Sequence, residues 1–248
     1  MFRAVLHAVV IVFLTLFTQI GGLAWLVSRV FQRKLLAFAA LYAALSMATL
    51  WLAPSFGRVA LSCSANSPLQ VQSWMYCALN RNYVSQELAE VLGDTAEEMS
   101  KRFPGTETLV LDANFPFFEG FPLLPHLSHD DGEKADLAFY YANETGYLPG
   151  ATRSPIGYFA FEEGATTCTK GGPSLRWNLR HLQPLWADYT LDAARNQAAL
   201  QILSNDARVG KIFVEPHLAQ KLGATHAKVR FQGCRAARHD DHIHLQLK

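Results

Sequence analysis

The stretch HDDHIHLQL at residues 239–247 decides the fold class, because it combines a strand pattern with a candidate site. Successive side chains of a strand point to opposite faces. His242 and His244 therefore share one face, and Gln246 follows them on it. The opposite face is entirely apolar and consists of Ile243, Leu245 and Leu247. We expect the apolar face to be buried in a core while the two imidazoles point together into a cleft.

A second histidine cluster lies upstream, in the stretch HLSHDDGEKAD at residues 126–136. Its Asp-Asp-Gly sequence at 130–132 is typical of a turn. His129 before the turn and Asp136 on the following strand can therefore converge, although they are seven residues apart. Two histidines and one aspartate that leave one position open are typical of a catalytic zinc site rather than a closed structural one.

Other polar residues near these clusters have simpler interpretations. A set of isolated histidines is expected to be solvated or hydrogen-bonded without a role in the site: His7, His181, His217 and His226. The acidic residues beside the clusters are expected to form solvated turns: Asp130, Asp131, Glu133, Asp240 and Asp241. The last cluster could also be an adventitious metal-binding tail, but such a tail does not need alternating leucines.

Short runs of strand and helix character surround the two clusters. Strands are predicted at 108–113, 135–141, 211–214 and 242–247, and helices at 85–92, where Gly93 can end the helix, and at 191–203. Residues 142–176 are rich in Gly, Ser, Thr and Pro, which favours a long loop at or near a site. We therefore expect residues 58–248 to form one α+β domain, a small antiparallel sheet with flanking helices.

The first 57 residues differ sharply in composition from the rest of the chain. They hold only four charged side chains: Arg3, Arg29, Arg33 and Lys34. The uncharged stretches predict two transmembrane helices, at about 4–28 and 35–54, joined by a basic turn at 29–34 that faces the cytoplasm. Both ends of this hairpin then face outward, and residues 58–248 are extracytoplasmic. A cleaved signal peptide fits less well, because the first apolar run is too long for one.

Cysteine usage and charge agree with an outer domain. The four cysteines, Cys63, Cys77, Cys168 and Cys234, all follow the apolar part, in a compartment where disulfides persist. They predict two bridges, with three possible connectivities.

The net charge of +1 argues against a nucleic-acid partner. The motifs H-E-x-x-H and G-x-S-x-G are absent from the sequence, which excludes a zincin and disfavours a serine acyl-enzyme.

The two clusters together resemble a known family. The spacing H-x-S-H-x-x-G-x-x-x-D at 126–136, followed by H-x-x-H-x-H at 239–244, is similar to that of the penicillin-insensitive murein endopeptidases. These belong to a group of zinc peptidases that includes lysostaphin, D-Ala-D-Ala peptidases and the hedgehog signalling domain. The segments 191–200 and 209–216 also resemble the helix and strand that precede the family's last histidine motif.

The resemblance implies a role for each matching residue. His129, Asp136 and His244 would bind Zn²⁺, and His242 would act as general base or as an electrostatic partner of the transition state. His239 and His126 match further active-site histidines of the family. The implied fold is the hedgehog-like or D-Ala-D-Ala-peptidase-like α+β fold. Asp130 replaces a usual Gln and Gln246 a usual Arg, and these differences concern substrate preference rather than the metal site.

The implied protein is a membrane-anchored zinc metallopeptidase of the inner (cytoplasmic) membrane with a periplasmic catalytic domain. It would hydrolyse peptide cross-links of peptidoglycan, as a D,D- or L,D-endopeptidase, by means of zinc-activated water. Alternatives are a carboxypeptidase that trims stem peptides, a processing enzyme for a protein substrate, and a non-catalytic zinc-containing module that binds cell-wall peptides. A regulatory protein partner is compatible with each of them.

Overall fold

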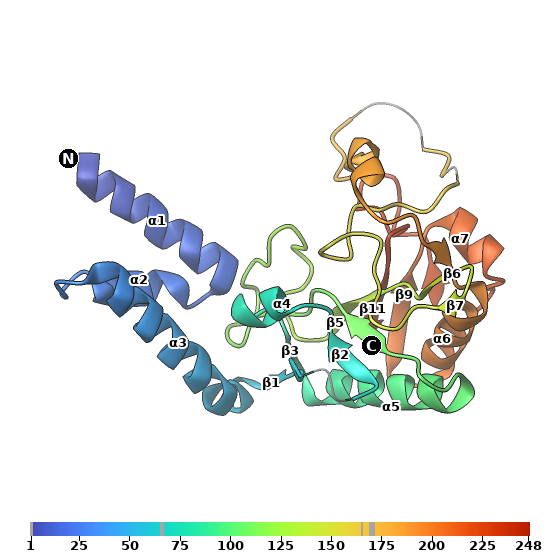
Figure 1. Cartoon of the computed structure of the whole chain (residues 1–248), viewed down its shortest axis with the longest axis horizontal. Helices are drawn as coiled ribbons and strands as arrows, with labels where there is room; N and C mark the ends of the chain where they lie inside the picture. The colour runs from blue at the N-terminus through green and yellow to red at the C-terminus, as the bar shows by residue number, and fades with distance from the viewer. Residues whose placement is uncertain (1, 65–66, 165, 169–171) are drawn as a thin grey trace.

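A computed structural model describes residues 2–64, 67–164, 166–168 and 172–248 of the chain. Apolar helices at the N-terminus lie to one side of a mixed α+β part (Figure 1). The α-helices are α1 Phe2–Thr18, α2 Gly21–Ser28, α3 Lys34–Leu52, α4 Trp74–Ala78, α5 Gln86–Arg102, α6 Ala193–Asn205 and α7 Pro216–Lys221. Two 3₁₀ helices cover Ala53–Phe56 and Arg180–Leu185.

A six-stranded sheet with the order β10-β9-β11-β5-β4-β2 forms the centre of the α+β part. Its strands are β2 Leu69–Val71, β4 Thr108–Val110, β5 Lys134–Ala138, β9 Val209–Phe213, β10 Val229–Arg230 and β11 His242–Leu247. The predicted α+β class is confirmed. The expectation of a purely antiparallel sheet is wrong, because the β2–β4 and β9–β10 pairs at its two edges are parallel. Helices α5 and α7 lie in the connections between these pairs, and parallel strands require such crossovers.

Two smaller sheets complete the strands. They consist of β1 Val59–Ala60 with β3 Tyr83–Val84, and of β6 Tyr141–Asn143 with β7 Gly146–Tyr147 and β8 Thr190–Leu191. The predicted strand at 135–141 is therefore two strands, and the long segment from 148 to 179 has no regular element among its described residues, as its composition predicts.

The apolar face of β11 lies in the core, as its alternation predicts. Ile243, Leu245 and Leu247 are at most 3% exposed. They belong to one cluster with apolar side chains of α5 and α6, two helices that contact each other. Helix α5 begins at the predicted place, where the Ser85 hydroxyl accepts a hydrogen bond from the Leu88 amide, but it does not end at Gly93. These helices cover one face of β11 and leave the face with the histidines for the site.

The first apolar stretch is not one helix. The expected helix at 4–28 is wrong, because the chain reverses at Gln19 (φ 64°) between α1 and α2. Gly22 allows the close approach: a Cβ atom there would lie 2.7 Å from the Ile11 carbonyl oxygen. The Thr18 hydroxyl accepts a hydrogen bond from the Gly21 amide at the start of α2. Among the described residues, only Lys34–Phe56 is a helical stretch long and apolar enough to cross a membrane. The prediction of two such helices is therefore wrong, and the described chain has one.

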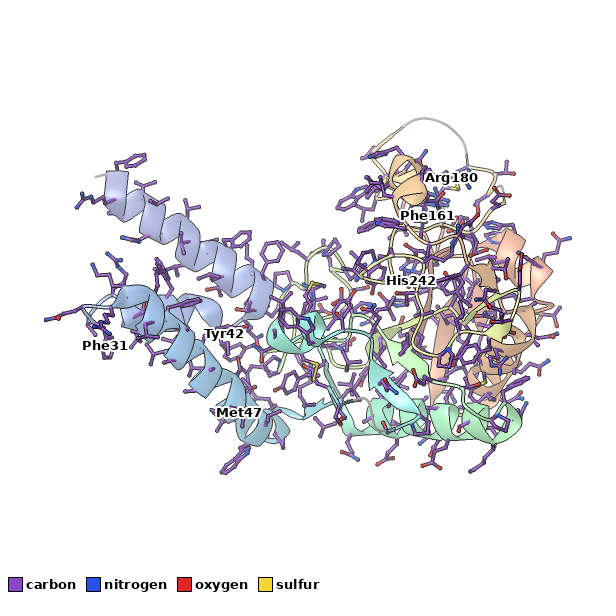
Figure 2. The ribbon with its side chains drawn as sticks, in the orientation of Figure 1. Phe31, Tyr42, Met47, Phe161, Arg180 and His242 are labelled. Carbon is purple, nitrogen blue, oxygen red and sulfur yellow. A yellow bond between two sulfur atoms is a disulfide. The ribbon has the colours of Figure 1, made fainter. Side chains whose placement is uncertain are left out.

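The reversal changes the expected arrangement of the N-terminus. The His7 ring of α1 lies 6.0 Å from the Trp25 ring of α2, so the start of α1 packs beside α2. The N-terminus and the 29–33 turn consequently lie at the same end, away from the α+β part (Figures 1 and 2). The expected two-helix hairpin with both ends beside the outer domain is therefore not formed. All four basic residues of the first 57 gather at the remote end.

Both disulfides are present, with the connectivity that the sequence left open. Cys63 is bonded to Cys77, which joins the segment after β1 to α4. Cys168 is bonded to Cys234, which joins the long loop segment to the segment that leads into β11. The second bridge therefore fastens part of the long loop segment beside the residues that precede β11.

We predict that Gly22→Ala and Gly93→Ala have opposite effects on the thermal unfolding midpoint of the detergent-solubilised chain. A methyl group at Gly22 clashes with α1 and should cost about 1–3 kcal/mol. At Gly93, within α5, the methyl group would meet nothing within 4 Å, and the gain in helix propensity is about 0.5–1 kcal/mol. Equal midpoints for the two variants would show that the close approach of α1 and α2 does not contribute to stability.

Candidate metal centre

The pairing of β5 with β11 brings two of the predicted ligands together. In this antiparallel register Asp136 lies directly opposite His244. Both side chains are almost completely buried, with exposed fractions of 0% and 3%. Because directly opposite residues of an antiparallel pair point to the same face, the carboxylate and the imidazole meet without any further constraint.

His129 completes this group, here called the metal cluster: His129, Asp136 and His244. The His129 Nε2 atom lies 3.2 Å from Nδ1 of His244 and 3.4 Å from Oδ1 of Asp136. The His244 Nδ1 to Asp136 Oδ1 distance is 2.8 Å. Donors of a tetrahedral zinc site with bonds near 2.05 Å are about 3.3 Å apart. The three atoms can therefore hold one metal ion, and the sequence-predicted ligands are confirmed as neighbours.

The turn at 130–132 and the Ala113 carbonyl, just beyond the end of β4, orient His129. Gly132 has φ 84°, a conformation that favours glycine, so the predicted turn is confirmed. The Nδ1–H group of His129 donates to the Ala113 carbonyl over 2.8 Å. This bond fixes the ring and leaves Nε2 as the free donor toward the other two ligands, as the outer partners of metal-binding histidines commonly do.

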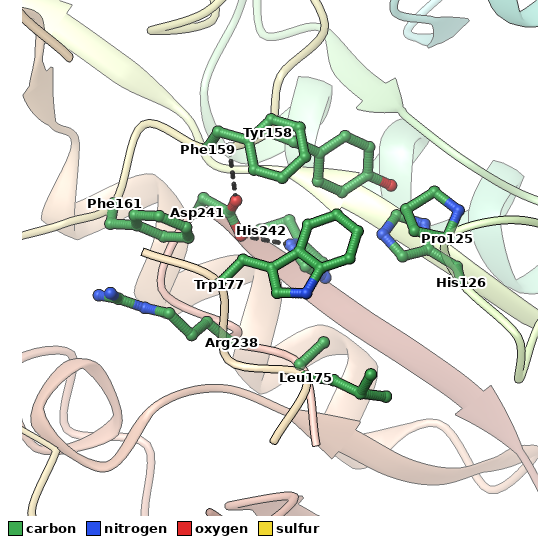
Figure 3. A pocket seen from close by; sticks show the side chains of 11 residues that line it. Pro125, His126, Tyr158, Phe159, Phe161, Leu175, Trp177, Arg238, Asp241 and His242 are labelled. Atoms are coloured by element: carbon green, nitrogen blue, oxygen red, sulfur yellow. Dashed lines mark hydrogen bonds and ion pairs between the residues drawn. The ribbon is translucent and has the colours of Figure 1, made fainter. Parts of the chain in front are cut away.

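His242 lies next to the metal cluster rather than within it. Its Nε2 atom is 3.5 Å from Asp136 Oδ1, and its Nδ1–H group donates to Asp241 over 2.6 Å. The other Asp241 oxygen accepts a hydrogen bond from the Phe159 amide (Figure 3).

The expectation that Asp241 belongs to a solvated turn is wrong, since it is 3% exposed. Asp240 is buried as well and pairs with Arg238, whereas Asp131 stays partly exposed beside Lys134.

His126 and His239 flank the same group. His126 Nδ1 lies 3.0 Å from Asp112 and 3.4 Å from Asp136. The His239 ring lies 5.0 Å from the His242 ring. All six residues of the two predicted sets therefore converge, and they form two groups whose donor atoms could hold a metal ion: His239, His242 and His244, and His126, His129 and Asp136.

Three residues of the site were not predicted from the sequence. Arg81 donates to both carboxylate oxygens of Asp112, over 2.5 and 2.7 Å, and this buried pair adjoins His126. The Tyr158 hydroxyl donates to Oδ2 of Asp136 over 2.7 Å, and so fixes the oxygen that faces away from the other ligands. None of the three stands in a recognisable motif. Asp112 does lie as the one charged residue within the predicted strand at 108–113, which is the one signal that could have marked it.

The carboxylates of the site stay ionised despite their burial. Burial raises the pKa of Asp136, but the surrounding imidazoles, above all that of His242, outweigh it and hold this pKa well below its usual range. Burial likewise opposes the charge of Asp112, and the Arg81 guanidinium lowers its pKa to about 2.

Desolvation, together with the neighbouring imidazoles, lowers the pKa of His239 well below its ordinary value. Burial lowers the pKa of His244 to about 4, whereas the Asp136 carboxylate outweighs burial and raises the pKa of His129. Because a histidine binds a metal ion in its neutral form, metal binding would displace a proton from His129.

An open pocket of about 510 Å³, here called the aromatic pocket, has His242 among its lining residues (Figure 3). Its walls are mainly aromatic and apolar: Tyr158, Phe159, Phe161, Leu175 and Trp177. Of these five wall residues, all except Trp177 belong to the 142–176 segment. The prediction of a loop at the site is therefore confirmed. A neighbouring pocket of about 620 Å³ is lined by His129, Asp136 and His244 themselves. It shares His126, Leu175 and His242 with the aromatic pocket, so the two pockets adjoin at these residues.

Comparison with known proteins identifies no family for this chain. No protein-family model matches the sequence, and no curated protein is significantly similar to it. The resemblance to murein endopeptidases therefore stays a prediction that depends on the two histidine motifs.

We predict that His129→Ala and His244→Ala each weaken metal binding by more than about a hundredfold, which exceeds the loss expected for an outer-shell partner. Equilibrium competition with a chromogenic chelator, using Zn²⁺ and then Co²⁺, measures the affinity. His181→Ala is the matched control, because this histidine is exposed and remote from the cluster. An unchanged affinity in either ligand variant would exclude the metal cluster as the binding site.

Tyr158→Phe should weaken the same binding by about tenfold, because Asp136 loses the hydrogen bond that orients its carboxylate. The same competition experiment gives the value. Tyr147→Phe serves as the control, since its hydroxyl contacts the Glu107 backbone away from the site. Equal affinity in the two variants would show that Tyr158 does not position Asp136.

Proposed function

We propose that this chain is a membrane-anchored zinc peptidase that hydrolyses peptide cross-links of peptidoglycan. One observation carries the proposal: three buried donor atoms within 3.4 Å of one another lie beside an oriented histidine at the base of an open pocket. A closed structural metal site needs neither the pocket nor the additional histidine.

The donor set supports zinc as the metal. Two imidazole nitrogens and one carboxylate oxygen suit this ion, and three protein ligands leave one position for a further molecule. The chemistry that zinc supplies when bound is polarisation of a carbonyl group and a lower pKa of water. One anionic ligand among two neutral ones leaves positive charge to stabilise a developing oxyanion.

His242 is the residue that we propose to transfer the proton. Asp241 holds its Nδ1–H group, so Nε2 is directed toward the metal cluster, where it accepts a proton from water and returns it to the leaving amine. The Phe159 amide in turn fixes Asp241. This chain of contacts gives His242 one ring orientation before the substrate binds.

The N-terminal helices support an anchor in the cytoplasmic membrane. Helix α3 has the length and hydropathy of a membrane-crossing helix. We propose that α1 and α2 lie beside it in the same bilayer. The four basic residues gather at the end remote from the α+β part, which by the positive-inside rule faces the cytoplasm. The two disulfides then lie in the periplasm, where they persist.

The test is digestion of purified cross-linked muropeptides by the zinc-loaded full chain in detergent, followed by mass spectrometry. We expect cleavage at the cross-link and loss of cleavage with a chelator. His242→Asn should lower kcat by at least about a hundredfold, the usual contribution of general acid–base catalysis, while zinc affinity changes little. His226→Asn, an exposed histidine outside the site, is the control and should retain full activity.

The reaction products also distinguish the proposed endopeptidase from the alternative functions. Stem peptides that lose a terminal residue indicate a carboxypeptidase. Zinc binding without turnover of any muropeptide contradicts the proposed hydrolase and indicates a binding module. Full activity of His242→Asn would remove this histidine from the mechanism.

A further inference from the structure

A second cavity joins the membrane helices to the candidate metal centre. This cavity, here called the interfacial cavity, has a volume of about 590 Å³. It begins at Phe17, at the end of α1, and continues along apolar side chains, namely Met75, Leu79, Leu124 and Ile156. It ends at His126 and Tyr158, which also line the aromatic pocket. An apolar path therefore leads from a membrane helix to the residues around the metal cluster.

The charged residues of this cavity lie at its inner end. Arg81 and Asp112 line it there, next to His126, and neutralise each other through two hydrogen bonds. The remainder of the wall offers mainly apolar side chains. The cavity thus suits an apolar chain that ends at a polar group near the metal cluster.

Direct contacts fix the membrane helices relative to the cavity. The Gln19 side chain, at the reversal between α1 and α2, donates to the Phe117 carbonyl over 2.8 Å and accepts from the Phe117 amide over 2.9 Å. The Tyr42 hydroxyl, in the middle of α3, donates to the carbonyl of Ala78 at the end of α4 over 2.5 Å. These bonds hold α4 and the 115–125 segment, two walls of the cavity, against the apolar helices.

The contact with Tyr42 also places the cavity beside the apolar helices. Tyr42 lies well inside the helix that we propose to cross the bilayer (Figure 2), so α4 is beside this helix and not beyond its end. Trp74 on α4 and Phe118 in the adjacent segment are 79% and 60% exposed. Exposed aromatic side chains are typical of the membrane–water interface. The end of the cavity at Phe17 therefore adjoins the side of the α+β part that faces the membrane helices.

We infer that the interfacial cavity binds the apolar chain of a lipid-linked peptide, whose peptide part extends to the metal cluster. The inference rests on the proposed function and narrows it. A nascent strand that still carries its lipid while it is being cross-linked to the wall would be cleaved at the membrane surface, whereas a peptide of the finished wall has no apolar chain for this cavity.

Photocrosslinking tests the occupant without requiring catalysis. The probe is a cross-linked stem-peptide dimer with an N-terminal hexadecanoyl chain that ends in a diazirine. It is added to the full chain in lipid nanodiscs, and mass spectrometry locates the photocrosslinks. We expect crosslinks on α4 and near Ile156. Leu79→Trp, which fills the cavity, should reduce them about tenfold, the equivalent of 1.4 kcal/mol of binding free energy. Met47→Trp, an exposed position on α3, should leave them unchanged.

Crosslinks confined to exposed positions of α1 and α3, with equal yields in the two variants, would overturn the inference. A parallel assay compares kcat/KM for the same peptide with and without the hexadecanoyl chain. If the wild-type chain cleaves neither peptide, the proposed function fails, and the crosslinks still decide the role of the cavity. If it cleaves both equally and no crosslink reaches the cavity, the inference fails and the proposed function stands.

Discussion

The antiparallel pairing of β5 with β11 is the constraint on which the candidate centre depends. It places Asp136 opposite His244 and, two residues along, Ala138 opposite His242. A shift of one residue in this register would turn both imidazoles toward α5 and α6 and bring the leucines to the site. The burial of Ile243 and Leu245 therefore fixes the position of the ligands, so stability and site geometry share one cause.

Burial of so many polar groups requires that each has a partner. Asp112 pairs with Arg81, Asp241 with His242, and Asp240 with Arg238, all largely removed from solvent. A buried pair adds little net stability, but removal of one member leaves an uncompensated charge that costs about 3–5 kcal/mol. The site is consequently a network in which a carboxylate or carbonyl group outside the metal cluster orients the rings of His126, His129 and His242.

The sequence predicted the parts of this site that depend on local patterns. Strand alternation placed His242 and His244 on one face, and the turn at 130–132 allowed His129 to approach Asp136. Arg81, Asp112 and Tyr158 were missed because they come from three separate segments and meet only in the folded chain. The reversal at Gln19 was missed because hydropathy measures composition and not the close approach that Gly22 permits. The parallel edge pairs depend on long crossovers, which no local pattern reports.

The wall of the aromatic pocket shows how a segment without regular structure becomes part of a defined site. Trp177 lies on a segment that the Cys168–Cys234 bridge joins to the residues before β11, and the Leu175 amide donates to the Arg235 carbonyl. Glu215, fully buried, accepts hydrogen bonds both from Arg176 and from the His239 amide. One carboxylate thus connects the pocket wall to the histidine segment. Because these contacts order the wall before a ligand arrives, less conformational entropy is lost on binding, and a shallow pocket can select its ligand by shape.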